Sequence, residues 1–288
     1  MSGITEFVTA HEKVIRMSFF FGILAVMAIW EVIAPRRKLT ASKSVRWTNN
    51  LGIVFLNSFL IRLVFPAAAV GVAGFVNSQG WGLVNHYQIP FVPAVIGSVV
   101  ILDFVIYLQH VMVHAVPVLW RLHRMHHADL DFDVTTGARF HPIEIFLSML
   151  IKFAAIVVLG PPIIAVIIFE VVLNATAMFN HGNVRLPKSL DRVLRWFVVT
   201  PDMHRVHHSV NDDEANSNFG FNLPWWDRLF GTYRDQPREG HEGMTIGIHK
   251  YRDPKQVSWI HGMLLLPFRG KISGYVINRR EWSKPDES

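Results

Sequence analysis

Long apolar runs separated by short polar loops constrain the fold of this chain more than any other feature. Three of them are long enough to cross about 30 Å of hydrocarbon as helices. They extend from Met17 to Pro35, from Leu51 to Val76 and from Phe91 to His114. Only 17% of the 288 residues are charged, fewer than the roughly 25% of ordinary soluble domains. We therefore predict an all-α, polytopic membrane protein.

A fourth apolar stretch, from Ile143 to Phe179, is too long for a single span. It is interrupted at Gly160-Pro161-Pro162, where two prolines lack the amide donors that a helix needs. Each arm has about 17 residues and a length of about 26 Å, close to the hydrocarbon thickness. We expect a helical hairpin that just crosses the membrane or re-enters it, with both ends on one side.

Basic residues predict how these helices are oriented. Residues 77–90 contain neither Lys nor Arg, whereas the loop after the first run contains Arg36, Arg37, Lys38, Lys43 and Arg46. The positive-inside rule then places the N-terminus outside and the end of the third run at the cytoplasmic face. No run after Gly182 is long enough to span, so we expect a cytoplasmic helical cap there.

The organisation that follows is one domain with a membrane part and a cap. We assign residues 1–90 to an N-terminal transmembrane region, 91–235 to a catalytic part and 236–288 to a cytoplasmic or interfacial tail. Within the tail, residues 253–268 suit a helix lying in the membrane interface or one packed on the cap. The net charge of +6 lies beside apolar runs, which favours anionic lipid over nucleic acid as the partner.

Histidine is the residue type that points to chemistry. The chain has 15 histidines and no cysteine, so disulfides, iron–sulfur clusters and thiolate metal sites are excluded. Nine histidines form a HisxxxHis box, two HisxxHisHis boxes and one isolated position, and offsets of three and four place imidazoles on one helix face. They are His110, His114, His123, His126, His127, His181, His204, His207 and His208.

Nine imidazoles are too many for one metal ion, because a tetrahedral site takes four ligands and an octahedral site six. Two ions fit the count, and iron, zinc, manganese and copper all accept such donors. A redox-active iron pair would also explain the membrane, since unactivated C–H bonds of lipids require a strong oxidant. Three alternative interpretations fit the histidine pattern less well. Histidines that only pack in a core would not repeat a box, and haem ligands would lie singly on facing helices. A metal transporter would place its ligands near mid-bilayer.

These boxes resemble those of the fatty acid hydroxylase superfamily, the membrane di-iron enzymes that include sterol desaturases, sterol C4-methyl oxidases and alkylglycerol monooxygenase. The boxes match in order and spacing, as do the stretches Arg139-Phe-His141-Pro-Ile-Glu144, Phe179-Asn-His181, Asn218-Phe-Gly220 and Trp226-Asp-Arg-Leu-Phe-Gly231-Thr232. The resemblance covers about residues 95–235 and implies that the nine histidines are iron ligands.

The chain departs from the family pattern at one place. Some members have a fuller HisxxxHis box near the position of His181, whereas here Ala177 and Arg185 flank it. Water or a carboxylate would then complete the shell of that metal.

Asp103 lies inside the third run, seven residues before His110 on one helical stripe. An acid within a membrane segment is a functional candidate. We expect its carboxylate to accept a hydrogen bond from the non-coordinating nitrogen of a ligand histidine. Pairing with Arg62 of the second run is the alternative.

Other polar residues are expected to support the site. Glu170 and Asn174 precede His181 on one helix face, and Asp227 belongs to the Trp-Asp-Arg motif. His141 is expected to start a helix rather than to bind metal. The aromatic residues expected to fill the core of the cap are Phe219, Phe221, Trp225 and Trp226.

Residues and resemblance together predict an integral membrane di-iron oxygenase that uses O₂ to hydroxylate or desaturate a lipid. Sterol, fatty acyl chain, ether lipid and carotenoid remain open as substrates. No nicotinamide-binding glycine motif or fused haem domain is visible, so a separate ferredoxin, cytochrome or reductase is expected to supply electrons. The alternative is a histidine-rich membrane metal-binding or transport protein without oxygenase activity.

Overall fold

Helices are the secondary structure of this chain, which a computed structural model describes over residues 3–270. Within that range only isolated β-bridges occur in place of strands, so the predicted all-α class is confirmed. Residues 271–288, which belong to the predicted C-terminal tail, lie outside the described part, as do residues 1 and 2.

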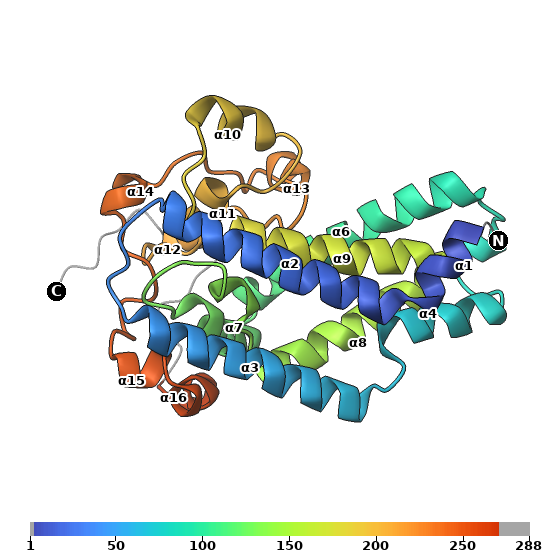
Figure 1. Cartoon of the computed structure of the whole chain (residues 1–288), viewed down its shortest axis with the longest axis horizontal. Coiled ribbons are helices and arrows are strands. Elements are labelled where there is room, and N and C mark those ends of the chain that lie inside the picture. The colour runs from blue at the N-terminus through green and yellow to red at the C-terminus, as the bar shows by residue number, and fades with distance from the viewer. Residues whose placement is uncertain (1–2, 271–288) are drawn as a thin grey trace.

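Five long helices run along the longest axis of the molecule (Figure 1). They are α2 (Glu12–Ile33), α3 (Lys43–Val64), α6 (Phe91–Ala115), α8 (Pro142–Leu159) and α9 (Ile163–Asn180), with α1 (Gly3–Ala10) preceding α2. By length and composition, α2, α6, α8, α9 and the stretch 43–86 could each cross a membrane. Outward-facing Val26, Ile29, Phe59 and Ile96 are at least 59% exposed, which suits lipid rather than water. The chain is an integral membrane protein.

The second apolar run is divided between two helices. The prediction of one continuous helix over Leu51–Val76 is therefore wrong. Helix α3 ends at Val64, and α4 (Ala68–Ser78) starts after a turn that contains Pro66. Proline has no N–H and disfavours helical backbone in the residue before it, so α3 stops there. Helix α4 then packs against α8 and α9, and the short α5 (Leu83–His86) follows.

The predicted hairpin is confirmed, with α8 and α9 joined at Gly160-Pro161-Pro162. Gly160 ends α8 in the left-handed region at φ 66°, and a Cβ there would lie 2.3 Å from the carbonyl oxygen of Trp81. Asn77 donates to the carbonyl of Pro161 at 2.7 Å. The tip of the hairpin is therefore held against residues 77–85.

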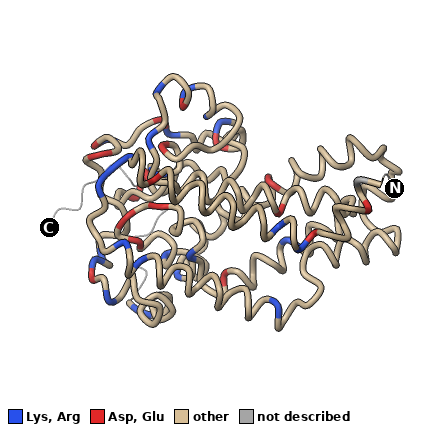
Figure 2. The backbone as a smooth tube through the Cα atoms, in the orientation of Figure 1, with Lys and Arg blue, Asp and Glu red and all other residues tan. Residues whose placement is uncertain are grey.

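The remaining elements form a cap at the end of the bundle where α6 and α9 end and α8 begins (Figure 1). Lys, Arg, Asp and Glu gather at this end (Figure 2). The cap elements are α7 (Pro117–His127), η1 (Thr136–Ala138), α10 (Lys188–Leu194), α11 (Pro201–His207), α12 (Asp212–Ala215), α13 (Trp225–Leu229), α14 (Gly240–Gly243), α15 (Pro254–Val257), α16 (Ile260–Leu265) and η2 (Leu266–Phe268).

Residues 253–268 form three short elements, α15, α16 and η2, rather than one helix. Val257 and Met263 are buried in a core with Ile53 of α3, whereas Trp259 and Phe268 are exposed. The segment therefore packs on the protein along one face and leaves an aromatic face uncovered.

A buried ion network fixes the loop between α7 and α8. The guanidinium of Arg46 in α3 binds Asp129 at 2.6 Å and also binds Asp133, and Arg139 lies 3.3 Å from Asp129. Burial raises the pKa of Asp129, but the two guanidinium groups outweigh it and hold that pKa well below its ordinary value. This loop is thereby attached to the membrane part directly after the first HisxxHisHis box.

Candidate metal centre

The nine predicted histidines all come together, buried inside the cap end of the bundle. They come from the last turns of α6, α7 and α11 and from the residues that follow α9 and α11. Helix α7 begins with Pro117 and α11 with Pro201, where a missing N–H has no cost. The hydroxyl of Thr200 also accepts from the amide of Met203, so α11 starts at a point that turns its histidines inward.

The nine imidazoles form two groups, and within each group the ligand-capable nitrogens lie within 4.8 Å of one another. The first group is His110, His114, His123, His127 and His207, and the second is His126, His181, His204 and His208. The groups adjoin, because the rings of His127 and His208 have centroids 4.5 Å apart. This arrangement offers two neighbouring nitrogen-only metal sites.

Backbone carbonyls orient three of these rings through Nδ1. His110 donates to Phe219 at 2.8 Å, His181 to Ala177 at 2.8 Å, and His207 to Ser217 at 2.7 Å. A proton on Nδ1 leaves Nε2 as the free acceptor of each ring. The Nε2 atoms of His110 and His207 are buried without a hydrogen-bond partner among the described residues.

A carboxylate orients a fourth ring. Glu144, in the first turn of α8, lies 2.6 Å from Nδ1 of His123, and both side chains are buried. The Nε2 atom of His123 has no hydrogen-bond partner among the described residues. This contact is the support that histidine ligands of metals typically have. Glu144 belongs to the motif that begins at Arg139, but its contact with His123 was not predicted from the sequence.

Pairs of Nε2 atoms also face each other. His114 and His127 are 3.1 Å apart at these atoms, and His181 lies 3.2 Å from His126 and 3.1 Å from His204. Converging lone pairs at such distances fit a shared cation. Among the residues that the structure describes, no carboxylate belongs to either group, so the donor set consists of imidazole nitrogen.

The protonation states agree with metal binding. Burial, reinforced by neighbouring imidazoles, lowers the pKa of His126, His127, His204 and His208 well below the ordinary value. The neutral imidazole, which is the form that binds metal, is therefore the stable one at neutral pH.

Asp103 does not take the expected position beside a ligand ring or beside Arg62. Its carboxylate accepts from the amides of Asn222 and Leu223 and, at 2.8 Å, from the indole of Trp226. It therefore holds the loop before α13 against the middle of α6. Asp103 and His110 both lie buried on α6, as predicted, but the carboxylate of Asp103 contacts Trp226 and not a ligand ring.

Asp227 also acts on this loop rather than on a histidine. It accepts from the amides of Phe219 at 2.8 Å and Gly220 at 2.7 Å, and from the hydroxyl of Thr232 at 2.6 Å. Burial raises the pKa of Asp227 to about 6, against the effect of these donors. The carbonyl of Phe219 accepts from His110, and the amide of the same residue donates to Asp227. Asp227 therefore positions the ring of His110 through Phe219.

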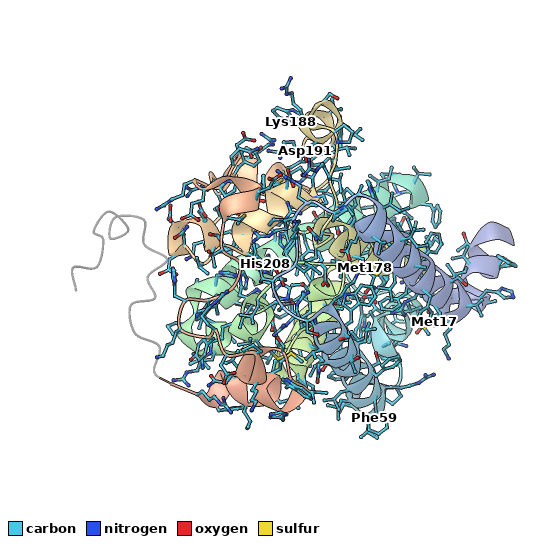
Figure 3. All side chains as sticks on the ribbon, turned by 60° about the vertical axis from the view of Figure 1, so that its left-hand side comes forward. Met17, Phe59, Met178, Lys188, Asp191 and His208 are labelled. Carbon is cyan, nitrogen blue, oxygen red and sulfur yellow. The ribbon has the colours of Figure 1, made fainter. Side chains whose placement is uncertain are left out.

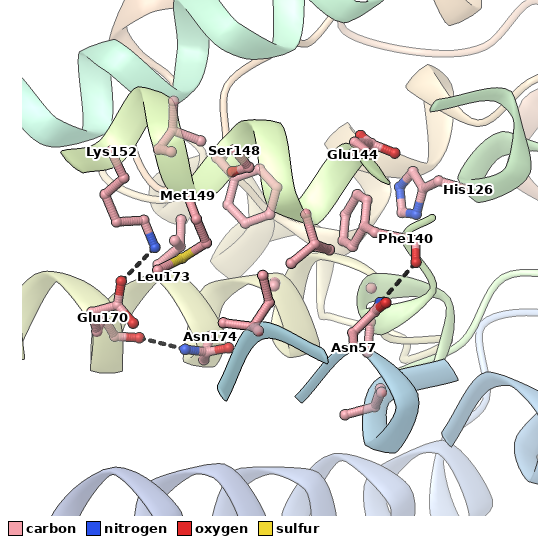
Figure 4. Close-up of a pocket in the computed structure, with 18 of the residues that line it drawn as sticks. Asn57, His126, Phe140, Glu144, Ser148, Met149, Lys152, Glu170, Leu173 and Asn174 are labelled. Carbon is pink, nitrogen blue, oxygen red and sulfur yellow. Dashed lines mark hydrogen bonds and ion pairs between the residues drawn. The ribbon is translucent and has the colours of Figure 1, made fainter. Parts of the chain in front are cut away.

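A pocket of about 350 Å³ extends from the histidines into the membrane part (Figure 4). His126 and Glu144 lie at one end, and the ion pair of Lys152 with Glu170 lies at the other. Its wall between these ends includes Ile106, Met149, Leu173, Met178 and Phe221.

Glu170 and Asn174 therefore line the pocket without supporting a histidine. Glu170 binds Lys152 and also Arg16, at 2.9 Å, and Asn174 donates to the backbone of Glu170. Phe221 likewise belongs to the pocket wall rather than to the core of the cap. His141 starts α8 as expected, accepting from the amide of Ile143.

Comparison with known proteins gives the same picture for the part of the chain that carries the histidines. Residues 95–232 match the family model described as fatty acid hydroxylase. An ornithine lipid hydroxylase of Rhizobium tropici is 27% identical over 238 residues, which cover 80% of this chain and 69% of that protein.

Two further relatives match over shorter ranges. An alkylglycerol monooxygenase of Xenopus tropicalis is 29% identical over 57% of this chain and 35% of its own length. A Delta(7)-sterol 5(6)-desaturase of Eremothecium gossypii is 32% identical over 48% of this chain and 36% of its own. The chain thus spans about a third of each of these two proteins. No solved structure matches it.

Proposed function

This chain belongs to the fatty acid hydroxylase superfamily through residues 95–232, and on that premise we propose that it is a di-iron oxygenase of the membrane. The names of its relatives, which are a lipid hydroxylase, a monooxygenase and a desaturase, support an O₂-dependent lipid hydroxylase or desaturase. The observation that carries the proposal is the convergence of nine buried histidines at one end of a largely apolar pocket. These relatives favour an oxygenase over a metal carrier.

Two irons fit the donor set of the centre. The five imidazoles of the first group would hold one ion, and the four of the second group would hold the other. Water would complete the coordination of the ion in the second group. The buried Nε2 atoms without partners support this assignment, since an unpaired buried polar atom is costly unless a ligand binds it. When bound, the two irons supply the oxidising power that an unactivated C–H bond requires, with O₂ and external electrons.

The protein's own part in the reaction is to hold the ring nitrogens and the lipid in place. Glu144 and the carbonyls of Ala177, Ser217 and Phe219 fix four imidazoles, so that their Nε2 atoms point to the centre. The apolar pocket wall excludes water from the reacting carbon.

The pocket opens sideways, between α2 and α3. Arg16 and Phe20 of α2 line it on one side and Ser58 and Ile61 of α3 on the other, and the pocket-lining Ser58 and Asn174 are exposed. A lipid could therefore enter from the bilayer without leaving it. We propose this opening as the route of the substrate.

The ion network of Lys152, Glu170 and Arg16 bounds the apolar part of the pocket. Eight residues separate Glu144 from Lys152 on α8, a rise of about 12 Å. A pocket of this length and volume suits a segment of acyl or alkyl chain better than a ring system. We therefore place fatty acyl and ether lipids before sterols and carotenoids as substrates.

Orientation and electron supply follow from the basic loop. Arg36 and Arg37 join α2 to α3 beside the cap, where Arg36 binds Asp202 at 3.1 Å. The positive-inside rule places this end in the cytoplasm and the N-terminus outside. A cytoplasmic ferredoxin, cytochrome or reductase would then reach the cap directly.

Lipid profiling tests the function. A host expressing the wild type is compared with hosts expressing His207→Ala and, as a control outside the centre, His249→Ala, which changes an exposed histidine. We expect a lipid that has gained one oxygen or lost two hydrogens with the wild type and His249→Ala only. Identical profiles in all strains, or a product that survives His207→Ala, would reject the proposal.

A further inference from the structure

Seven large apolar side chains form an exposed surface on one side of the cap. We name it the aromatic lobe; each side chain is at least 45% exposed. Its residues come from α10, the turn after it, α13 and the residue that follows α13, and they are Leu190, Val193, Trp196, Phe197, Trp225, Leu229 and Phe230. So large an apolar patch on a part expected to lie in the cytoplasm requires a partner.

The lobe is a single unit built by the fold. The indole of Trp225 donates to the carbonyl of Trp196 at 2.7 Å, which joins α13 to the end of α10. The guanidinium of Arg228 lies 3.9 Å from the ring centroid of Trp196 and 4.1 Å from that of Tyr233, and it donates to the carbonyl of Arg195. Its charge is thus covered by rings, and the apolar side chains are held outward.

The lobe adjoins the membrane part well inside the span. Phe230 stacks on Phe104 and Tyr107 of α6, with ring centroids 5.9 Å and 5.6 Å apart. Phe104 lies eleven residues, or about 16 Å, before the end of α6 at Ala115. On the same helix Ile101 and Leu108 are each 46% exposed, so the lobe continues the lipid-facing surface of α6.

The charges of α10 suit the edge of a membrane. Lys188 and Arg192 are exposed on this helix. Helix α10 lies at the outer edge of the cap, away from the bundle (Figure 1), and Figure 3 shows Lys188 and Asp191 there. Trp beside Lys and Arg is the composition found where protein crosses from hydrocarbon to headgroups. Long basic side chains can reach anionic headgroups while their neighbours stay in lipid.

We propose that the aromatic lobe inserts into the leaflet on the histidine side, so that part of the cap lies in lipid and not in the cytoplasm. The seven side chains would contact acyl chains and the headgroup boundary, and Lys188 and Arg192 would meet anionic headgroups. This inference rests on the membrane part and its aromatic contacts, and it is independent of the reaction.

The absence of cysteine from the natural sequence makes a direct test available. Single cysteines are introduced by Val193→Cys and Leu229→Cys in the lobe, and a nitroxide is attached to each. Arg192→Cys, on the neighbouring position of α10, is the matched control, and Ile96→Cys reports the lipid-facing surface of α6. All four positions are exposed, so the substitutions disturb no packing.

The full chain is reconstituted, one copy per disc, in phosphatidylcholine and phosphatidylglycerol, and collision with O₂ and with a water-soluble nickel chelate is measured by electron paramagnetic resonance. We expect the ratio of O₂ to nickel accessibility at Val193→Cys and Leu229→Cys to be several-fold higher than at Arg192→Cys and to approach that of Ile96→Cys. Ratios equal to that of Arg192→Cys would overturn the proposal. The nitroxides on the lobe could also be accessible to nickel in discs with one copy and inaccessible in discs with two copies. That result would assign the surface to contact with a second copy of the chain and would overturn the proposal.

Discussion

Glu144 holds the Nδ1 atom of His123 at 2.6 Å, and through this contact the first turn of a membrane helix orients a ring of the metal centre. The carboxylate and the imidazole come from segments 21 residues apart, on α8 and α7. A carboxylate on the far nitrogen of a ligand histidine fixes its tautomer and makes it a stronger ligand.

Glu144→Gln should weaken iron binding by about 10- to 100-fold, because the neutral amide orients His123 less strongly. Competition with a chelator of known affinity measures the change. Glu239→Gln, at an exposed position of the cap, should leave iron affinity as it is in the wild type. An unchanged affinity in Glu144→Gln would show that the contact does not support the centre.

Gly137→Ala should displace His181. An added Cβ at this position would lie 2.5 Å from the carbonyl oxygen of Ala177 and 2.9 Å from Nδ1 of His181, closer than real contacts allow. We expect a loss of about 1–3 kcal/mol in stability and a deficit of iron in the second group. Thermal unfolding and iron content measure these two effects. Gly97→Ala, where the Cβ would meet no atom within 4 Å, is the control and should leave both unchanged.

Asp227→Asn should loosen the loop that supports His110. The amide of asparagine cannot accept from Phe219, Gly220 and Thr232 together as the carboxylate does. We expect a loss of about 1–3 kcal/mol in stability, together with slower lipid oxidation. Denaturation in detergent and turnover measure the two, and normal values of both would contradict the positioning role.

Sequence reasoning succeeded where local chemistry decides the structure. The prolines after Gly160 break the fourth apolar run in any environment, and offsets of three and four place histidines on one helix face wherever the helix lies. For this reason the hairpin and the grouping of histidines within each box followed from the residues alone. The convergence of all nine also required the predicted topology and the family resemblance.

The partners of the acids depended on packing that no local pattern reveals. Asp103 lies on the same stripe as His110, but its carboxylate meets Trp226, which is 123 residues away. The carbonyls that orient His110 and His207 carry no side-chain signature at all. Glu144 did have a signal, since it is an acid in the first turn of a helix within a matched motif. Pro66 also has a sequence signal, since a proline inside an apolar run disfavours a continuous helix there.

Leu173→Trp should block the pocket without disturbing the metal. The larger ring would fill space between the histidines and the ion pair of Lys152 with Glu170. We expect lipid oxidation to fall by about tenfold or more while iron content stays normal, since a misplaced substrate costs rate without touching the ligands. Ile168→Trp, on the exposed face of the same helix, should retain activity.

Wild-type turnover in Leu173→Trp would contradict the assignment of the pocket, because the lipid would then reach the centre by another route. Equal loss in both variants would indicate a general effect of tryptophan on α9 instead.

The two histidine groups predict how many iron ions one intact chain binds. Metal analysis of the purified full chain by mass spectrometry should give about two irons, as expected for five and four imidazoles. His207→Ala and His208→Ala, one from each group, should each lower that number. One iron or none in the wild type, or a count that neither substitution changes, would contradict the two-metal centre.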